Sequence, residues 1–218
     1  MRILVIIVSG EMHISLRENI QILKDSFNDE HQVDYAAVSS QDDFKNYEDI
    51  ISFKFKMINS VSQLSKVRDF IEKYRTDLDY DWYIKTRPEV KLLQQLDFTK
   101  YAENAMNARA RYYVGPKKIQ YGCSVGDPNG EWPSFYRGQY SDVEGEIILD
   151  DHIFIFDNSL INAGFYTQTE PYPPERQDEH YHTRFWNARK ITMNPIGINM
   201  IFTRPNGGFQ SRSGNVNM

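Results

Sequence analysis

The stretch Tyr80-Asp81-Trp82-Tyr83-Ile84-Lys85-Thr86-Arg87-Pro88-Glu89-Val90 decides the fold that we expect for this chain. Its aromatic and β-branched residues favour a β-strand, and the apolar run is too short for a helix of usual length. Pro88 ends the strand, because it has no N–H to donate and holds the preceding residue extended. A buried strand therefore delivers Lys85, Arg87 and Glu89 to its carboxyl end, where ligands bind in open α/β sheets.

The charges at this strand end have two interpretations. Two fixed positive charges beside one carboxylate suit a phosphorylated ligand with a divalent metal. Alternatively, Arg87 and Glu89 form a solvated turn with a surface ion pair, worth under about 1 kcal/mol. The residues alone leave both interpretations open, because short motifs often match by chance.

The same stretch resembles the core of GT-A glycosyltransferases, in which a hydrophobic strand ends in an Asp-x-Asp motif. Asp81 matches the leading Asp of that strand, and Arg87-Pro88-Glu89 falls on Asp-x-Asp. The stretch is also similar to a "YDwvirtRPD" variant in nucleotide-sugar glycosyltransferases of bacteria, algae and large algal viruses. The resemblance implies an α/β, single-domain GT-A-like (nucleotide-diphospho-sugar transferase) fold, with a central mixed, mostly parallel sheet flanked by helices.

The resemblance also implies a metal and a donor. Glu89 stands for the last carboxylate of the motif, the one that holds Mn²⁺ or Mg²⁺, while Arg87 replaces the first carboxylate. The expected donor is a UDP-sugar, with Lys85 and Arg87 at its diphosphate. The preference for UDP over GDP follows from the resemblance alone.

Asp79 and Asp81 also match the Asp-x-Asp pattern, just before the strand that begins at Trp82. These residues precede the strand, so we expect them at the opposite edge of the sheet from Glu89. Alternating acids in a loop between a helix and a strand are usually a solvated turn. We therefore do not assign the metal to them.

Composition bounds the class of protein. The 218 residues suffice for one large domain, and 40% hydrophobic with 25% charged residues is ordinary for a globular protein. The net charge of -5 argues against nucleic acid as the main partner. The single Cys123 excludes an internal disulfide and favours a reducing compartment. We expect a cytoplasmic protein, in the host cytoplasm if the chain is viral.

The N-terminal half predicts a β-α-β unit. Residues 3–8 are a continuous apolar run typical of a central parallel strand, and far shorter than the ~20 residues that a membrane span needs, so no transmembrane segment is expected. An amphipathic helix at 16–27 and a strand at 33–38 follow. Ser9, Gly10 and Ser39 should then share one sheet edge. By resemblance this edge holds the nucleotide; the alternative is ordinary loop residues.

Helices are also expected further along the chain. Apolar spacing predicts one at 61–74, with Lys66 off its apolar face. By resemblance Lys66 can reach the nucleotide, although such lysines more often only solubilise a helix. Residues 101–110 also read as a helix.

The C-terminal half carries a second candidate region. Asp150 and Asp151 stand between apolar runs, where charges are costly unless paired or functional. The resemblance implies that Asp151 faces the acceptor, with Asp150 as the second choice. The alternative is that one of these acids is the N-cap of the next segment. Residues 116–146, rich in glycine and aromatics, are either an acceptor-binding lid or an ordinary surface excursion.

These observations lead to one expected organisation and function. Residues 1–204 form the GT-A-like domain, with a nucleotide-binding half at 1–115 and an acceptor-side half at 116–204, and 205–218 form a mobile tail. The expected activity is metal-assisted transfer of a sugar from a UDP-sugar to a glycan or glycoprotein acceptor. The alternatives are a non-catalytic carbohydrate-binding or assembly module, and a nucleotide-sugar phosphohydrolase or nucleotidyltransferase.

Overall fold

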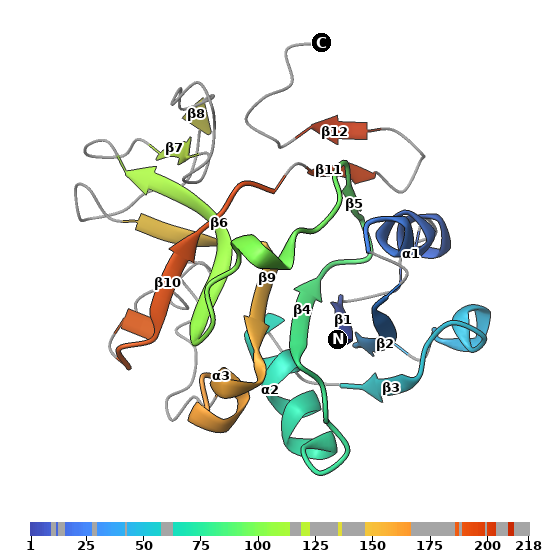
Figure 1. The fold of residues 1–218 in the computed structure, drawn as a ribbon. Helices are drawn as coiled ribbons and strands as arrows, with labels where there is room; N and C mark the ends of the chain where they lie inside the picture. Colours follow the sequence, from blue (N-terminus) through green and yellow to red (C-terminus); the bar gives the residue numbers. More distant parts are fainter. Residues whose placement is uncertain are drawn as a thin grey trace.

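The computed structural model describes residues 1–9, 12, 16–27, 30–41, 43–57, 63–113, 119–122, 135–136, 147–166, 186–187, 189–198, 200–203 and 209–211. The described chain forms a nine-stranded mixed sheet, helices on both of its faces and a three-stranded antiparallel sheet at one end (Figure 1). The strand order of the large sheet is β3-β2-β1-β4-β9-β6-β7-β8, and β10 pairs with β6.

The N-terminal part of the large sheet is parallel and comprises β1 (Arg2–Val8), β2 (Gln32–Ser39), β3 (Phe53–Lys56) and β4 (Trp82–Thr86). Helix α1 (Leu16–Asp25) connects β1 to β2, and α2 (Gln63–Tyr74) connects β3 to β4. The predicted β-α-β unit is confirmed. Strands β1 and β4 are buried along almost their whole length, as their continuous apolar runs require in a sheet covered on both faces.

The rest of the large sheet joins this parallel block through antiparallel pairing. Strand β9 (Ile147–Asp157) pairs antiparallel with β4 and with β6 (Ala105–Tyr113). Beyond β6 lie β7 (Ile119–Gly122) and β8 (Phe135–Tyr136), and β10 (Thr192–Pro195) runs parallel to β6. Helix α3 (Asn158–Ala163) follows β9 and ends at Gly164, whose φ of 67° is the left-handed conformation common at helix ends.

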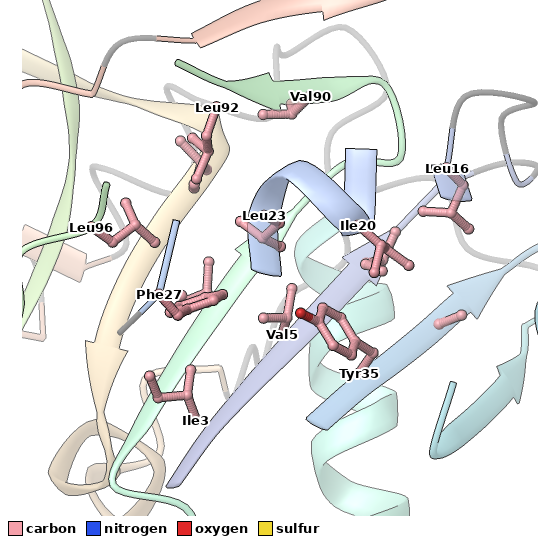
Figure 2. Close-up of a cluster of buried hydrophobic side chains, with 14 of the residues drawn as sticks. Ile3, Val5, Leu16, Ile20, Leu23, Phe27, Tyr35, Val90, Leu92 and Leu96 are labelled. Carbon is pink, nitrogen blue, oxygen red and sulfur yellow. The ribbon is translucent and has the colours of Figure 1, made fainter. Parts of the chain in front are cut away.

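Each face of the sheet has its own core. The Leu16, Ile20 and Leu23 side chains of α1 pack over Val5 and Tyr35 of the sheet (Figure 2). The residues of α2 pack on the other face, together with alternate residues of β1 and β4 and with the aromatic residues of β9. Successive β4 residues therefore face different helices: Ile84 faces α1, whereas Tyr83 faces α2.

The small sheet begins just after β4. Its order is β12-β11-β5, formed by β12 (Phe209–Ser211), β11 (Met200–Thr203) and β5 (Val90–Leu92). Strand β12 lies within the segment 205–218 that the sequence predicts as a tail. Residues 87–89 are thus the connection between the large sheet and the small one. Two short 3-10 helices, η1 (Lys45–Tyr47) and η2 (Phe98–Lys100), complete the described elements that are helical.

One predicted element is wrong. Residues 101–110 are not a helix: from Ala105 the chain is strand β6, which is paired on both sides, with β9 and with β7 and β10. Alanine and methionine favour helices locally, but this pairing with distant segments outweighs that preference. Asn107 reinforces the pairing from inside. Its side chain donates to the carbonyls of Ala102 (2.9 Å) and Ile155 (3.1 Å) and accepts from the Asn194 side chain (2.6 Å).

None of the helices in the described ranges is long and apolar enough to cross a lipid bilayer.

Candidate functional site

The carboxyl edge of the parallel strands brings together the first two predicted nucleotide residues. Val8 of β1 pairs with Val38 of β2, and the Ser9 amide donates a 3.0 Å hydrogen bond to the Val38 carbonyl. Ser9 and Ser39 therefore lie side by side where the two strands end. Ser39 is buried, and its hydroxyl accepts a hydrogen bond from the Gln41 amide at 3.1 Å. Gly10 lies outside the described residues.

Lys66 reaches this edge from helix α2. Its side chain is buried, and its Nζ donates a 2.5 Å hydrogen bond to the carbonyl oxygen of Ser9. The expectation that Lys66 lies off the buried face of the helix is wrong, because Lys66 lies among the buried residues of α2 with Leu64 and Val67. The cation thus joins the first helical turns of α2 to the end of β1.

Lys85 brings a second buried cation to the same place from β4. Its side chain has no exposed surface, and its Nζ donates to the side-chain oxygen of Gln63, the first residue of α2. The Nζ also lies 5.2 Å from the centre of the Phe154 ring, a cation–π arrangement. Both buried lysines therefore lie at or beside the start of α2, beneath the carboxyl edge. The low dielectric constant of a buried position strengthens their electric field.

Arg87 and Glu89 form a turn immediately after β4. The Val90 amide donates to the Arg87 carbonyl at 3.1 Å, which closes a β-turn with Pro88 at its favoured second position. Across this turn Arg87 Nε lies 2.6 Å from Glu89 Oε1, and the two side chains are 32% and 18% exposed. Solvent can thus reach the Arg87 side chain, in contrast to the buried Lys66 and Lys85.

Asn19 holds the turn from the other face of the sheet, and sequence reasoning missed it. This buried residue of α1 donates from Nδ2 to the Pro88 carbonyl at 2.6 Å. The signal was present in the sequence: Asn19 stands on the apolar face of α1 between Leu16 and Leu23. A polar residue on a buried stripe usually has a specific partner.

A second missed residue, Asp43, ties together the segments that follow β1 and β2. Its Oδ2 accepts a 2.5 Å hydrogen bond from the Met12 amide. Asp43 therefore helps to fix the backbone on the α1 side of the same edge.

Asp150 and Asp151 lie in strand β9, and their side chains are outside the described part of the structure. The backbone places them at the carboxyl edge, because Phe154 pairs with Lys85 and the antiparallel β9 approaches that pair from the side of Arg87. They also lie in an irregular part of β9, where the step of five residues from Phe154 back to Leu149 lies opposite the step of two residues from Ala108 to Ala110. Such bulges redirect side chains and are common beside active sites.

Two buried polar residues accompany this bulge. Arg109, which lies opposite it on β6, and His152, which lies within it, are both buried. Buried charged groups are costly unless they are paired, and each of these residues has an interaction partner. The bulge is therefore a polar region inside an otherwise apolar pair of strands.

Asp79 and Asp81 lie at the opposite edge of the sheet, beside the start of β1. The Asp81 carboxylate accepts from the Arg2 amide at 2.8 Å, and the Asp79 carboxylate pairs with the Arg2 guanidinium at 2.7 Å. The guanidinium also stacks over the Tyr80 ring, 4.9 Å from its centre. These contacts stabilise the start of the sheet, far along β4 from Arg87.

The described residues do not fit the metal that the resemblance implies. Within the described ranges, no three His, Cys, Asp or Glu side chains gather as a metal site would require. Oxygen Oε1 of Glu89 already binds Arg87. A divalent ion and a guanidinium about 4 Å apart repel each other by roughly 8 kcal/mol at an effective dielectric constant of about 20. Mn²⁺ or Mg²⁺ on Glu89 stays a prediction from the resemblance that these contacts do not support, and the chemistry proposed below needs no metal.

The fold is that of nucleotide-diphospho-sugar transferases, and the predicted GT-A-like fold class is confirmed. The nucleoside-diphosphate-sugar pyrophosphorylase from Vibrio cholerae RC9 matches with a TM-score of 0.50 and 8% sequence identity, over 90% of this chain and 91% of that chain. At this identity the likeness concerns the fold alone. No family model matches the sequence, and no curated protein matches it.

Two other solved structures are similar over most of the chain. A197 from STIV covers 100% of this chain and 99% of its own, at 11% identity and a TM-score of 0.48. The inositol-1-phosphate CTP transferase from T. maritima covers 89% of this chain and 84% of its own, at 9% identity and a TM-score of 0.43.

Proposed function

We propose that this protein transfers a sugar from a nucleotide-diphosphate donor to a hydroxyl group of a glycan or glycoprotein. The observation that carries the proposal is the convergence of Lys66, Lys85 and Arg87, from α2, β4 and the turn, on one carboxyl edge. In open α/β sheets this edge receives the ligand, and clustered cations suit a diphosphate. The resemblance of the key strand to GT-A enzymes supports a UDP-sugar as donor.

The proposed chemistry is a substitution at the sugar's anomeric carbon. The bond from that carbon to the diphosphate oxygen breaks, and a bond to the acceptor oxygen forms. Negative charge then builds on the departing nucleoside diphosphate. Fixed cations lower the energy of this charge separation, and they act most strongly where water is excluded. Arg87 would contact the diphosphate directly, while the buried Lys66 and Lys85 would contribute from beneath it.

The other roles follow from position along the same edge. Ser9 and Ser39, at the ends of β1 and β2, would position the nucleotide together with Gly10. Asp151, with Asp150 in reserve, would orient the acceptor hydroxyl or take its proton. The bulge of β9 and its place beside the end of β4 support this assignment.

The experiment is a product analysis with UDP-glucose, UDP-galactose and UDP-N-acetylglucosamine, each incubated with and without a panel of oligosaccharide acceptors. Transfer predicts that acceptors gain the mass of one sugar and that UDP release is faster when an acceptor is present. Equal UDP release without any acceptor would instead indicate a nucleotide-sugar hydrolase. Tight binding without turnover would indicate a non-catalytic module.

Nucleotidyl transfer is the second candidate, and the likeness to the pyrophosphorylase supports it. In that reaction a sugar 1-phosphate attacks a nucleoside triphosphate and pyrophosphate leaves. The two candidates consume different substrates. Formation of pyrophosphate from UTP with glucose 1-phosphate, without transfer from any UDP-sugar, would replace glycosyl transfer as the proposed function.

A further inference from the structure

The Arg87–Glu89 turn differs in its charge from an acidic metal motif. Oxygen ligands for a divalent ion must be free to turn toward it, and usually one or two carboxylates coordinate the ion. Here one of the two positions carries a guanidinium, and this guanidinium holds the remaining carboxylate at 2.6 Å. The turn therefore carries an internal ion pair, where an acidic metal motif would carry two carboxylates.

The turn is also held in place from several directions. Its backbone is closed by the hydrogen bond from Val90 to Arg87, and the Pro88 carbonyl is held by Asn19 at 2.6 Å. On its far side Val90 and Leu92 belong to the same core as the apolar side chains of α1 (Figure 2). A turn with fixed φ at Pro88 and anchored on both sides limits the positions that the Arg87 side chain can take.

The Arg87 guanidinium has donors besides the Nε that binds Glu89. Arg87 binds Glu89 through Nε, so its two terminal amino groups, Nη1 and Nη2, can still donate as a planar pair. That pair matches the oxygen spacing of a phosphate group. The ion pair itself is neutral; the buried Lys66 and Lys85 supply the net positive charge, and Arg87 supplies oriented donors.

We infer that the Arg87–Glu89 ion pair takes the place of a divalent metal in this protein. A nucleoside diphosphate is bound through the Arg87 guanidinium, which Glu89 orients, and its affinity does not depend on Mn²⁺ or Mg²⁺. This inference rests on the proposed function for the ligand class, but it concerns only how the diphosphate is held.

The experiment is calorimetric titration of UDP, GDP and CDP, and of uridine, into the whole protein in excess EDTA and again in excess Mn²⁺ or Mg²⁺. The inference predicts that the preferred diphosphate binds equally well in EDTA and in metal. Arg87→Ala should weaken that diphosphate by about 10- to 100-fold, the value of one lost charge-assisted pair, and leave uridine binding unchanged. Arg75→Ala, an exposed arginine just after α2, is the matched control and should change neither.

Glu89→Gln separates the two roles of the carboxylate. If Glu89 only orients Arg87, this variant keeps metal-free diphosphate binding and shows no response to Mn²⁺. Circular dichroism of each variant verifies that it is folded.

The remaining outcomes are distinct. Diphosphate binding that appears only with metal, and that Glu89→Gln abolishes, would overturn the inference and leave the proposed function standing. Equal losses of UDP and uridine in Arg87→Ala would overturn it by making the role of Arg87 structural. No binding of any diphosphate under any condition would overturn the proposed function, and the inference with it.

Discussion

The side-chain amide of Asn19 in helix α1 donates a 2.6 Å hydrogen bond to the carbonyl oxygen of Pro88, at the centre of the turn that follows β4. These two residues are far apart in the sequence, and both lie at the carboxyl edge of the sheet. The contact couples the packing of α1 to the position of Arg87 and Glu89. The stability of the helix and the geometry of the candidate site are therefore linked.

Asn19→Ala tests this link. The variant leaves the buried Pro88 carbonyl without its donor, and we expect the free energy of unfolding to fall by about 1–3 kcal/mol. Urea denaturation measures the loss, and UDP titration should show weaker binding than in the parent protein. Gln21→Ala, on the exposed side of the same helix, should leave both quantities unchanged. A stable variant with normal UDP affinity would show that the hydrogen bond does not hold the turn.

Lys66→Met tests the buried charge beneath the edge. Methionine keeps much of the side-chain volume but removes the cation and its bond to the Ser9 carbonyl. We expect UDP affinity to fall roughly tenfold or more, because the diphosphate loses a nearby positive charge, while uridine affinity falls less. Isothermal calorimetry measures both. Lys73→Met, an exposed lysine at the far end of α2, serves as the control. Equal losses for UDP and uridine would assign Lys66 a purely structural role.

Asp151→Asn tests the proposed acceptor-side residue. Removing the carboxylate should suppress sugar transfer by about 100-fold or more, as expected for loss of a general base, while donor binding stays at the parent level. Initial rates of UDP release with acceptor, compared with UDP affinity, separate the two effects. Asp150→Asn in parallel shows which of the neighbouring acids acts. Undiminished turnover in both variants would remove this part of β9 from the mechanism.

Asn107→Ala tests the polar network that fixes β6 within the sheet. The Asn107 side chain binds the backbone of Ala102 in both directions, and it also binds the Ile155 carbonyl. Its loss leaves several buried backbone groups without partners, so we expect a loss of roughly 3 kcal/mol in unfolding free energy. Chemical denaturation is the measurement. The exposed Asn187→Ala provides the matched control. A loss no larger than that of the control would mean that strand pairing alone holds β6.

Tyr83→Phe tests the response to alkaline pH. Burial raises the pKa of the Tyr83 phenol to about 12, above its ordinary value of 10.0. A raised pKa stabilises the folded state fully below the unfolded pKa, and this contribution is lost as the pH rises from about 10 toward about 12. The parent protein should therefore lose more stability between pH 9 and pH 11 than Tyr83→Phe does. Urea denaturation at the two pH values measures this, and identical losses would contradict the assignment.

The parallel half of the fold could be predicted from local patterns in the sequence. Apolar runs at residues 3–8 and 82–84 are too short for helices and too continuous for exposed strands, so they predict buried parallel strands without any knowledge of their partners. Pro88 marks the end of β4 by its own covalent structure, and Gly164 ends α3 because glycine adopts a positive φ without strain. These are local properties, which a single sequence carries in full.

The contacts at the carboxyl edge of the sheet could not be predicted in this way, because they depend on the folded chain. No pattern in the sequence brings Lys66 to the Ser9 carbonyl or Asn19 to Pro88, because each contact joins segments that only the folded sheet and its helices align. The strand at Ala105–Tyr113 was missed for the same reason: its residues are tolerated in helices, and distant partners on both sides impose the extended form. The ion pair between Arg87 and Glu89 lies between these cases. The sequence allowed this pair as one of two interpretations, and the closed turn brings the two charges together, since a side chain's partner depends on backbone geometry that composition does not encode.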